Sequence, residues 1–331
     1  MVVEGGKFII SLDFELLWGV RDEFTIDSYG ENLRGVQTAI PKLLAMFSSN
    51  KIKSTFATVG LLFFETKKEL LEFLDFRQPQ YKNPQFSPYQ NELLVIGESE
   101  VTDKYHFALQ LIKKIKQYPD QEIASHTFSH YYCLEEGQTI DDFREDIRAA
   151  VTIALKNDII IKSVVFPRNQ FNHDYLEVCR EFGITSVRGN EHSWMYASRN
   201  FDEETLSRRA FRFLDSYINI SGHHCYTDDF MASTQPFNIP SSSFLRQYKN
   251  GLGWLEWLRL LRIKNSMTFA AKNKLTYHIW WHPHNFGINQ EKNFAFLEKI
   301  LEHYKKLNQQ YNFTSYNMAG VSDYLQQKYG S

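Results

Sequence analysis

The sequence is poor in cysteine, and the three it has show no arrangement that indicates a disulfide framework. Cys133, Cys179 and Cys225 are the only cysteines in 331 residues, and no two of them have C-x-x-C spacing. An odd number of widely spaced cysteines argues against a disulfide scaffold and against a zinc site built from cysteine alone.

Long apolar runs and clusters of like charge are also absent. The richest apolar window, residues 252–263, contains Glu256, Arg259 and Arg262, which excludes a membrane span there. The N-terminal MVVEGGKFIISLD lacks the layout of a signal peptide. The net charge is −2 with scattered Lys and Arg, which argues against a nucleic-acid partner. We therefore expect a soluble cytoplasmic protein; its oligomeric state is left open.

Strand-like and helical segments alternate along the chain. Apolar, β-branched segments typical of strands occur at 7–13, 53–60, 121–125, 162–167, 185–190, 275–281 and 311–317. Such alternation predicts about seven parallel strands covered by helices, in a barrel or a doubly wound sheet. The rhythm breaks near 76–104 and 195–275, which we interpret as insertions in a single domain spanning 1–331.

Side chains capable of acid–base chemistry or metal binding occur at the ends of five of the predicted strands. Because the carboxyl ends of parallel strands share one rim, these residues are expected to meet there. They are Asp13 and Glu15; His126 and His130; Arg168 and Asn169; Glu191 and Trp194; and His282 and His284.

The acids of Asp13-Phe14-Glu15 are two residues apart, so on an extended chain both carboxylates point to one side. Like charges this close favour a cation between them. Taken alone, such a segment is more often a solvated strand end. The apolar run before it favours the cation.

His126 and His130 are four residues apart, which on a helix places both imidazoles on one side, compatible with one metal ion. The spacing alone does not distinguish ligands from ordinary polar residues. His278 and His282 have the same spacing in a segment that reads as a strand. There we expect His278 in the core and His282 at the rim as the catalytic candidate. His284 is the alternative candidate for that role. Two His and one carboxylate with open positions are typical of catalytic Zn²⁺.

Together these segments resemble the polysaccharide deacetylases of carbohydrate esterase family 4, which share a nodulation-type deacetylase homology domain. The resemblance covers most of the chain in the family's motif order. Its matches are SLDFE, SHTFSH, FPRNQF, NEHSW and WWHPHN. The SHTFSH segment fits the family's H-[ST]-x-x-H and is the most specific match. The resemblance implies a distorted (β/α) barrel.

The resemblance also implies a role for each matched residue. Asp13 aligns with the catalytic base and His282 with the general acid, whereas His126 and His130 align with metal ligands. Phe14 stands where the family carries a second, metal-binding aspartate, and Glu15 is expected to supply that ligand instead. Arg168 aligns with the group that orients the base, and Trp194 with a wall of the pocket. Asn169, Glu191 and His284 are expected to support the site or bind substrate.

The expected reaction is hydrolysis of an N-acyl group, an acetyl group in the first instance, on a sugar of surface-polysaccharide assembly. The cofactor would be a divalent metal, with Zn²⁺ as the expected ion, and a backbone N–H just after His130 would stabilise the oxyanion. The substrate would be an N-acylated sugar, linked to a nucleotide or a lipid. The alternatives are a deformylase or a ring-opening amidohydrolase of the same fold, and a non-catalytic sugar-binding barrel.

Overall fold

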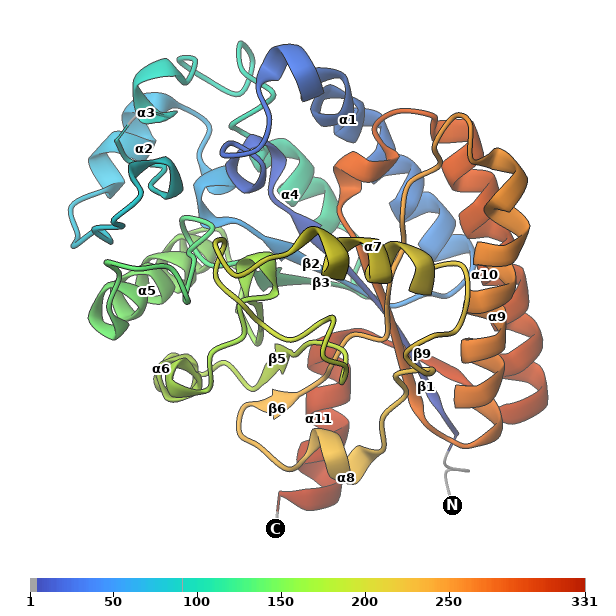
Figure 1. The fold of residues 1–331 in the computed structure, drawn as a ribbon. Coiled ribbons are helices and arrows are strands. Elements are labelled where there is room, and N and C mark those ends of the chain that lie inside the picture. The colour runs from blue at the N-terminus through green and yellow to red at the C-terminus, as the bar shows by residue number, and fades with distance from the viewer. Residues whose placement is uncertain (1–4, 91, 331) are drawn as a thin grey trace.

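The computed structural model describes residues 5–90 and 92–330 and contains one sheet of nine strands (Figure 1). The strand order is β6-β5-β4-β3-β2-β1-β8-β7, and β9 pairs with the first residues of β1. All pairings are parallel. The strands are β1 (Lys7–Phe14), β2 (Ser54–Thr58), β3 (Gln121–Ser125), β4 (Ser163–Val165), β5 (Ser186–Arg188), β6 (Phe237–Asn238), β7 (Ser243–Phe244), β8 (Thr276–Trp281) and β9 (Thr314–Tyr316).

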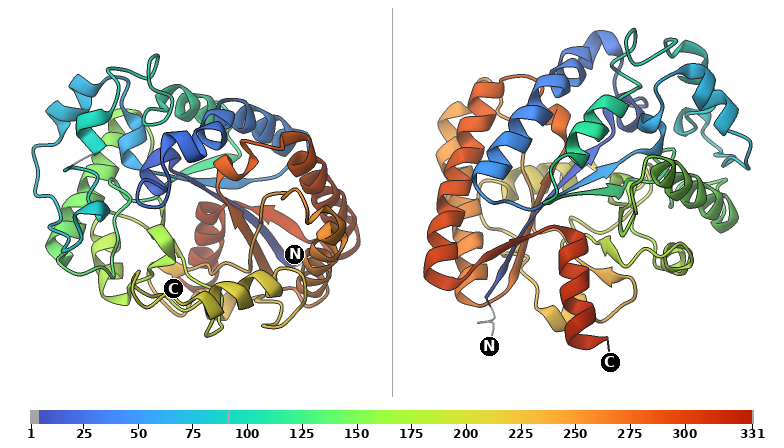
Figure 2. Two further views of the ribbon diagram at one scale, coloured as in Figure 1. Left: turned by 45° about the horizontal axis from the view of Figure 1, so that its top comes forward. Right: turned by 180° about the vertical axis from the view of Figure 1, so that it is seen from behind.

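Residues 237–245, here called the bridging segment, join the two edges of this sheet. The N–H groups of Ile239 and Ser241 donate to carbonyls at β5 and just after it, at 2.8 and 2.9 Å. Those of Ser242 and Leu245 donate to carbonyls of β8 at 2.7 and 2.8 Å. The sheet therefore curls into a distorted barrel, which confirms the expected architecture (Figure 2).

Helices surround the sheet, and α7 crosses in front of it in the view of Figure 1. No described helix has the length and apolar character needed to cross a membrane. The helices are α1 (Ile26–Ser49), α2 (Lys67–Phe73), α3 (Glu92–Val95), α4 (Leu109–Lys116), α5 (Ile140–Lys156), α6 (Leu176–Glu181), α7 (Leu206–Asp215), α8 (Asp228–Met231), α9 (Glu256–Lys272), α10 (Gln290–Tyr311) and α11 (Met318–Tyr329).

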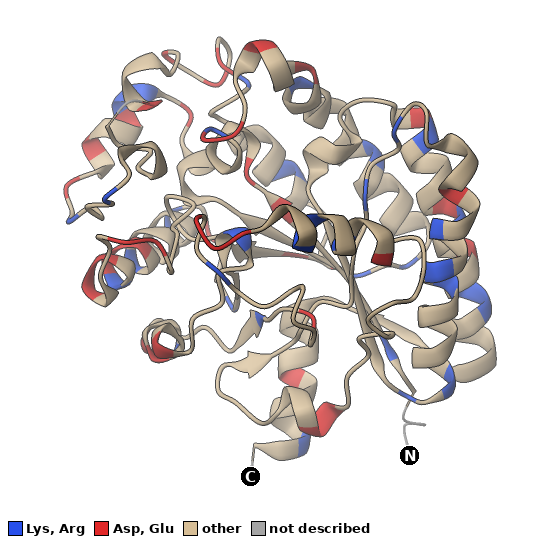
Figure 3. Ribbon diagram, viewed as in Figure 1, with Lys and Arg blue, Asp and Glu red and all other residues tan. Residues whose placement is uncertain are grey.

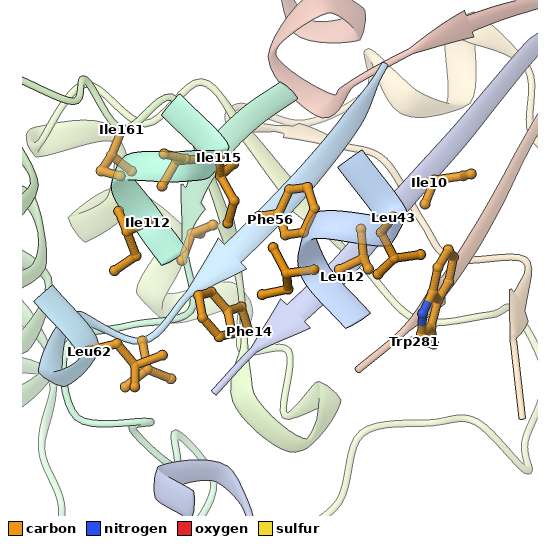
Figure 4. Close-up of a cluster of buried hydrophobic side chains, with 14 of the residues drawn as sticks. Ile10, Leu12, Phe14, Leu43, Phe56, Leu62, Ile112, Ile115, Ile161 and Trp281 are labelled. Atoms are coloured by element: carbon orange, nitrogen blue, oxygen red, sulfur yellow. The ribbon is translucent and has the colours of Figure 1, made fainter. Parts of the chain in front are cut away.

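The central strand β1 separates an apolar layer from a polar interior. Ile10, Leu12 and Phe14 are fully buried in the large core cluster with residues of α1 and α4 (Figure 4). Because side chains alternate along a strand, Ser11 and Asp13 face the barrel interior. Phe14 therefore belongs to the layer under the helices, whereas Glu15 follows on the same side as Asp13.

The seven segments predicted as strands all contain strands, but the prediction missed β6 and β7. Each has only two residues, too few to show a periodic pattern, and both lie in 195–275. That segment is therefore part of the sheet rather than only an insertion. The expected loop at 76–104 is largely irregular but includes α3 and a 3-10 turn at Pro84–Phe86.

Helix α1 packs directly on the 3-10 turn Pro283–Phe286 and the residues that follow it, at the end of β8. A Cβ built on Gly35 would lie 2.0 Å from the carbonyl oxygen of Gly287. We expect Gly35→Ala to lower the free energy of unfolding by about 1–3 kcal/mol through overpacking, measured by urea denaturation. Gly30→Ala in the same helix is the matched control, since a Cβ there would meet only side-chain atoms of Ile26 and Tyr105, at 3.2–3.4 Å. Equal stability of the two variants would contradict this close contact.

Candidate active site

Residues from the ends of separate strands gather in one cavity of about 620 Å³. Both acids after the apolar part of β1 lie in its wall, together with the histidines after β3 and β8. The sequence-predicted residues that line it are Asp13, Glu15, His126, His130, Arg168, Asn169, His282 and His284. A second cavity of about 270 Å³ shares several of the same lining residues and therefore adjoins it.

The carboxylate of Glu15 lies between two imidazoles. Its Oε2 is 3.1 Å from His130 Nε2 and 3.3 Å from His126 Nε2, and all three side chains are buried. Burial opposes ionisation of Glu15, but the nearby His282, His126 and His130 outweigh it and hold the pKa well below its usual range. Burial lowers the pKa of His130 to about 4, so this ring is neutral at pH 7.

The hydrogen bonding of His126 indicates that a cation fits between these groups. Its Nδ1 lies 2.9 Å from the carbonyl oxygen of Val165, which can only accept, so Nδ1 carries the proton. In the neutral ring the Nε2 lone pair then faces a carboxylate oxygen of Glu15. Donor atoms of a tetrahedral zinc site with bonds of about 2.0–2.2 Å lie about 3.3–3.5 Å apart, close to the separations found here. The donor set of Glu15, His126 and His130 therefore fits a divalent metal.

The segment that carries the two histidines is a loop, not the helix that the spacing suggested. Thr127 and His130 have φ of 63° and 57°, in the left-handed region that non-glycine residues seldom adopt. Asp146 of α5 accepts from the N–H groups of Phe128 and Ser129 at 2.6 and 3.1 Å and so fixes the turn. The imidazoles converge because of this clamped loop rather than through helical periodicity.

The expected oxyanion donor is already engaged. The N–H of Tyr131, which follows His130, donates to Thr127 Oγ1 at 2.7 Å. This hydrogen bond closes the histidine loop, so the group is not free to bind a reacting oxygen. The prediction for this backbone N–H was therefore wrong.

Asp13 is held by an arginine that the sequence analysis did not assign to it. Arg188, the last residue of β5, donates from its two terminal nitrogens to Oδ1 and Oδ2 of Asp13, both at 2.7 Å. Burial favours the neutral acid, but Arg188 outweighs it and lowers the pKa of Asp13 below its ordinary value. The Arg188 guanidinium also lies over the Trp280 ring, 4.2 Å from its centroid.

Arg168 does not orient Asp13, which corrects the expectation from the motif order. Its guanidinium pairs with Asp22 and lies over the ring of Tyr132 at 4.6 Å. Arg168 and Asn169 both have left-handed φ, of 54° and 52°. This turn directs Arg168 along the cavity wall, whereas Asn169 Oδ1 accepts from Arg188 at 3.2 Å.

His282 faces both acids across the cavity. Its Nε2 lies 3.5 Å from Glu15 Oε1 and 4.0 Å from Asp13 Oδ2. Asn285 Oδ1 accepts from the His282 backbone N–H at 3.1 Å and lies 3.2 Å from Nδ1. This carboxamide places the proton on Nδ1 and leaves Nε2 available to exchange a proton with a bound molecule.

His284 stacks on His282, with ring centroids 4.7 Å apart and planes 8° apart. Burial lowers the pKa of His284 to about 3, so the ring is neutral. Glu15, His282 and His284 form a second set of possible metal ligands. Imidazole lone pairs lie in the ring plane, so two parallel stacked rings do not converge on one ion. The rings of His126 and His130, by contrast, are 65° apart. The set with His126 and His130 is the better fit.

The remaining predicted residues are divided between the smaller cavity and the surface. Glu191 lines the smaller cavity, and burial raises its pKa above the ordinary value. Trp194 is 58% exposed, packs on Phe211 and lines neither cavity, so the predicted pocket wall is wrong. Trp280 of β8 lines both cavities instead. Trp280 is two residues from both His278 and His282, so its side chain points to the same side of β8. This alternation in the sequence could have identified it.

No family model matches the sequence, and no curated protein matches it either. Solved structures do match. A Mycobacterium smegmatis protein named as a polysaccharide deacetylase aligns with TM-score 0.61 at 11% identity, over 98% of this chain and 91% of its own. The chain has a polysaccharide-deacetylase fold. A Pseudomonas aeruginosa protein named likewise aligns with TM-score 0.54 at 10% identity, over 98% and 92%. PuuE allantoinase aligns with TM-score 0.56 at 9% identity, over 100% and 94%.

The two possible ligand sets can be separated by metal analysis of variants. We expect His126→Ala to lower the affinity for Zn²⁺ at least about 100-fold, because it removes one ligand of a three-residue set. His284→Ala is the control in the same cavity and should retain metal. Metal content after dialysis against a weak chelator is the measurement. Loss of metal in His284→Ala with retention in His126→Ala would assign the ion to the other set.

Proposed function

We propose that this chain is a metal-dependent hydrolase that removes an N-acyl group, an acetyl group in the first instance, from a sugar. The observation that carries the proposal is a carboxylate held ionised by Arg188, opposite His282 and beside a divalent-metal donor set in one cavity. Amide hydrolysis needs a base for the attacking water and an acid for the leaving amine. The polysaccharide-deacetylase fold favours a sugar as the carrier of that amide.

Each role is assigned to a side chain of the cavity. Glu15, His126 and His130 would hold a divalent ion, Zn²⁺ by the nature of the donors, which when bound activates water and polarises a carbonyl. Asp13 accepts the proton of the attacking water, since Arg188 keeps it ionised. His282 delivers a proton from Nε2 to the departing amine, while Asn285 keeps the ring oriented. Arg188 is a positioning residue held by Asn169 and stacked on Trp280.

We further assign the enzyme to assembly of surface polysaccharides in the cytoplasm, on sugars linked to a nucleotide or a lipid. This assignment comes from the sequence and is independent of the reaction chemistry. A second candidate is hydrolysis of a cyclic amide, favoured by the overall likeness to PuuE allantoinase. Release of a free amine from N-acetyl sugars, compared with opening of cyclic ureides, distinguishes the two.

The reaction is tested by amine release from N-acetylhexosamines, measured with the zinc-loaded protein and after chelation. We expect activity with zinc and its loss on chelation. Asp13→Asn should lower kcat about 10²–10⁴-fold, as for the loss of a general base, while metal content stays unchanged. Wild-type activity in Asp13→Asn would remove this residue from the mechanism. No amine from any N-acyl sugar would refute the function.

The pairing of Asp13 with Arg188 predicts a specific change in pH dependence. In Arg188→Gln the buried carboxyl loses its cation, so its pKa rises and the base becomes protonated at a higher pH. The acidic limb of kcat/KM should therefore move up by at least about one pH unit. Arg168→Gln is the control. Whatever its effect on the rate, the midpoint of the limb should not move, because Arg168 pairs with Asp22. Equal shifts in both variants would contradict the assignment.

A further inference from the structure

The two adjoining cavities share one arginine that lacks a partner. Arg246 follows β7 by two residues and lines both cavities. Its Nε is shut off from solvent without a hydrogen bond, and no described carboxylate pairs with the guanidinium. The rings of Phe213 and Phe244 flank it at 5.5 and 5.8 Å. These rings attract the cation only weakly, and a half-buried charge without an anionic partner remains costly unless something binds it.

The other arginines deep in these cavities each pair with a carboxylate. Arg212 pairs with Glu204 at 2.7 Å, and Arg262 donates to the Gly222 carbonyl and lies 3.8 Å from Asp215. Arg168 has its own carboxylate in Asp22. Burial together with the nearby positive charges of Arg212 and Arg259 lowers the pKa of Arg246. Positive charge therefore accumulates at Arg246 without a matching acid. Helix α7, which contributes Arg212 to both cavities, carries basic and acidic residues (Figure 3).

The backbone around Arg246 is held in place by hydrogen bonds on both sides of the residue. Arg259 of α9 donates to the carbonyls of Arg246 and Gln247, in the latter case at 3.3 Å. The N–H of Tyr248 donates to Asn293 at 2.7 Å. With Leu245 bonded to β8, both sides of Arg246 are fixed. The hydrogen bonds therefore fix the backbone from which this unpaired side chain enters the cavities, and the two rings flank its guanidinium.

The Arg246 site lies next to the proposed reaction centre. The ring of Phe244 is 5.8 Å from the His282 ring centroid and 5.8 Å from the Arg246 guanidinium. One aromatic ring therefore separates the proposed acid from the unpaired cation. A sugar whose amide reaches His282 would place a neighbouring substituent near Arg246.

We propose that Arg246 binds a phosphate or diphosphate ester on the substrate sugar. The inference rests on the proposed function, since it defines the substrate of the same site. The fork of a guanidinium matches phosphate oxygens in pairs, so a single arginine can bind a phosphate through two hydrogen bonds. A sugar nucleotide and a lipid-linked sugar diphosphate share this chemistry. The site thus selects a charged, activated sugar over a neutral oligosaccharide.

Binding is tested without catalysis, by calorimetric titration of inorganic pyrophosphate into the chelator-treated full-length protein. We expect saturable binding that weakens at least about tenfold in Arg246→Gln, and less in Arg246→Lys, which keeps the charge but loses the fork. The matched control is Arg180→Gln, which removes an arginine paired with Glu177 on the surface. It should bind as the parent does. Equal binding by parent and Arg246→Gln, with unchanged thermal unfolding, would overturn the proposal.

Kinetics then separate the two sources of the phosphate and the two proposals. Arg246→Gln should raise KM about tenfold for a nucleotide-diphosphate N-acetyl sugar or a polyprenyl-diphosphate one, with little change in kcat. The KM for a neutral N-acetyl oligosaccharide should stay unchanged. The charged substrate with the higher kcat/KM shows whether the bound phosphate belongs to a nucleotide or to a lipid carrier. Amine release without any effect of Arg246→Gln would refute this inference alone. Pyrophosphate binding lost in Arg246→Gln without amine release from any sugar would refute the proposed reaction alone.

Discussion

The buried ion pair between Asp13 and Arg188 organises the interior of this barrel. It links the central strand β1 to β5, and Asn169 and Trp280 also contact Arg188. Arg188 also donates to Ser11 Oγ at 3.0 Å, and Ser11 in turn contacts His278 Nε2 at 2.8 Å. Removing one partner of such a pair costs about 3–5 kcal/mol because the other is left as a buried charge. The pair therefore fixes the strands around the cavity and the ionisation of Asp13 at the same time.

Much of the architecture was predictable because it depends on local patterns that repeat. Seven strands with apolar, β-branched sequences gave the barrel, and the shared rim of parallel strands brought Asp13, Glu15, His126 and His282 together. The Asp-Phe-Glu alternation also predicted which side chains share a face. Phe14 lies under the helices, so Glu15 is the next position that reaches the interior.

What the sequence did not predict depends on side-chain direction at the ends of short strands. Arg168 and Arg188 both follow apolar strands, and choosing between them requires knowing that Arg168 lies in a left-handed turn. Trp194 and Trp280 differ in the same way, since only Trp280 lies on a strand, β8, whose alternation directs its side chain into the barrel. The histidine loop has helical spacing without helical backbone, because Asp146 of α5 supplies a constraint from a distant part of the chain.

The bridging segment has a consequence for how such a barrel can diversify. The proposed base lies within a strand of eight residues and the proposed acid follows one of six, whereas Arg246 follows a strand of only two. Long strands tie the reactive groups to many neighbouring hydrogen bonds, and a change there disturbs the whole sheet. Arg246 comes directly after the bridging segment, and its side chain donates no hydrogen bond to a described strand, so it can change without disturbing the sheet. Evolution could therefore exchange the carrier on which the sugar is presented while the bond-breaking apparatus stays the same.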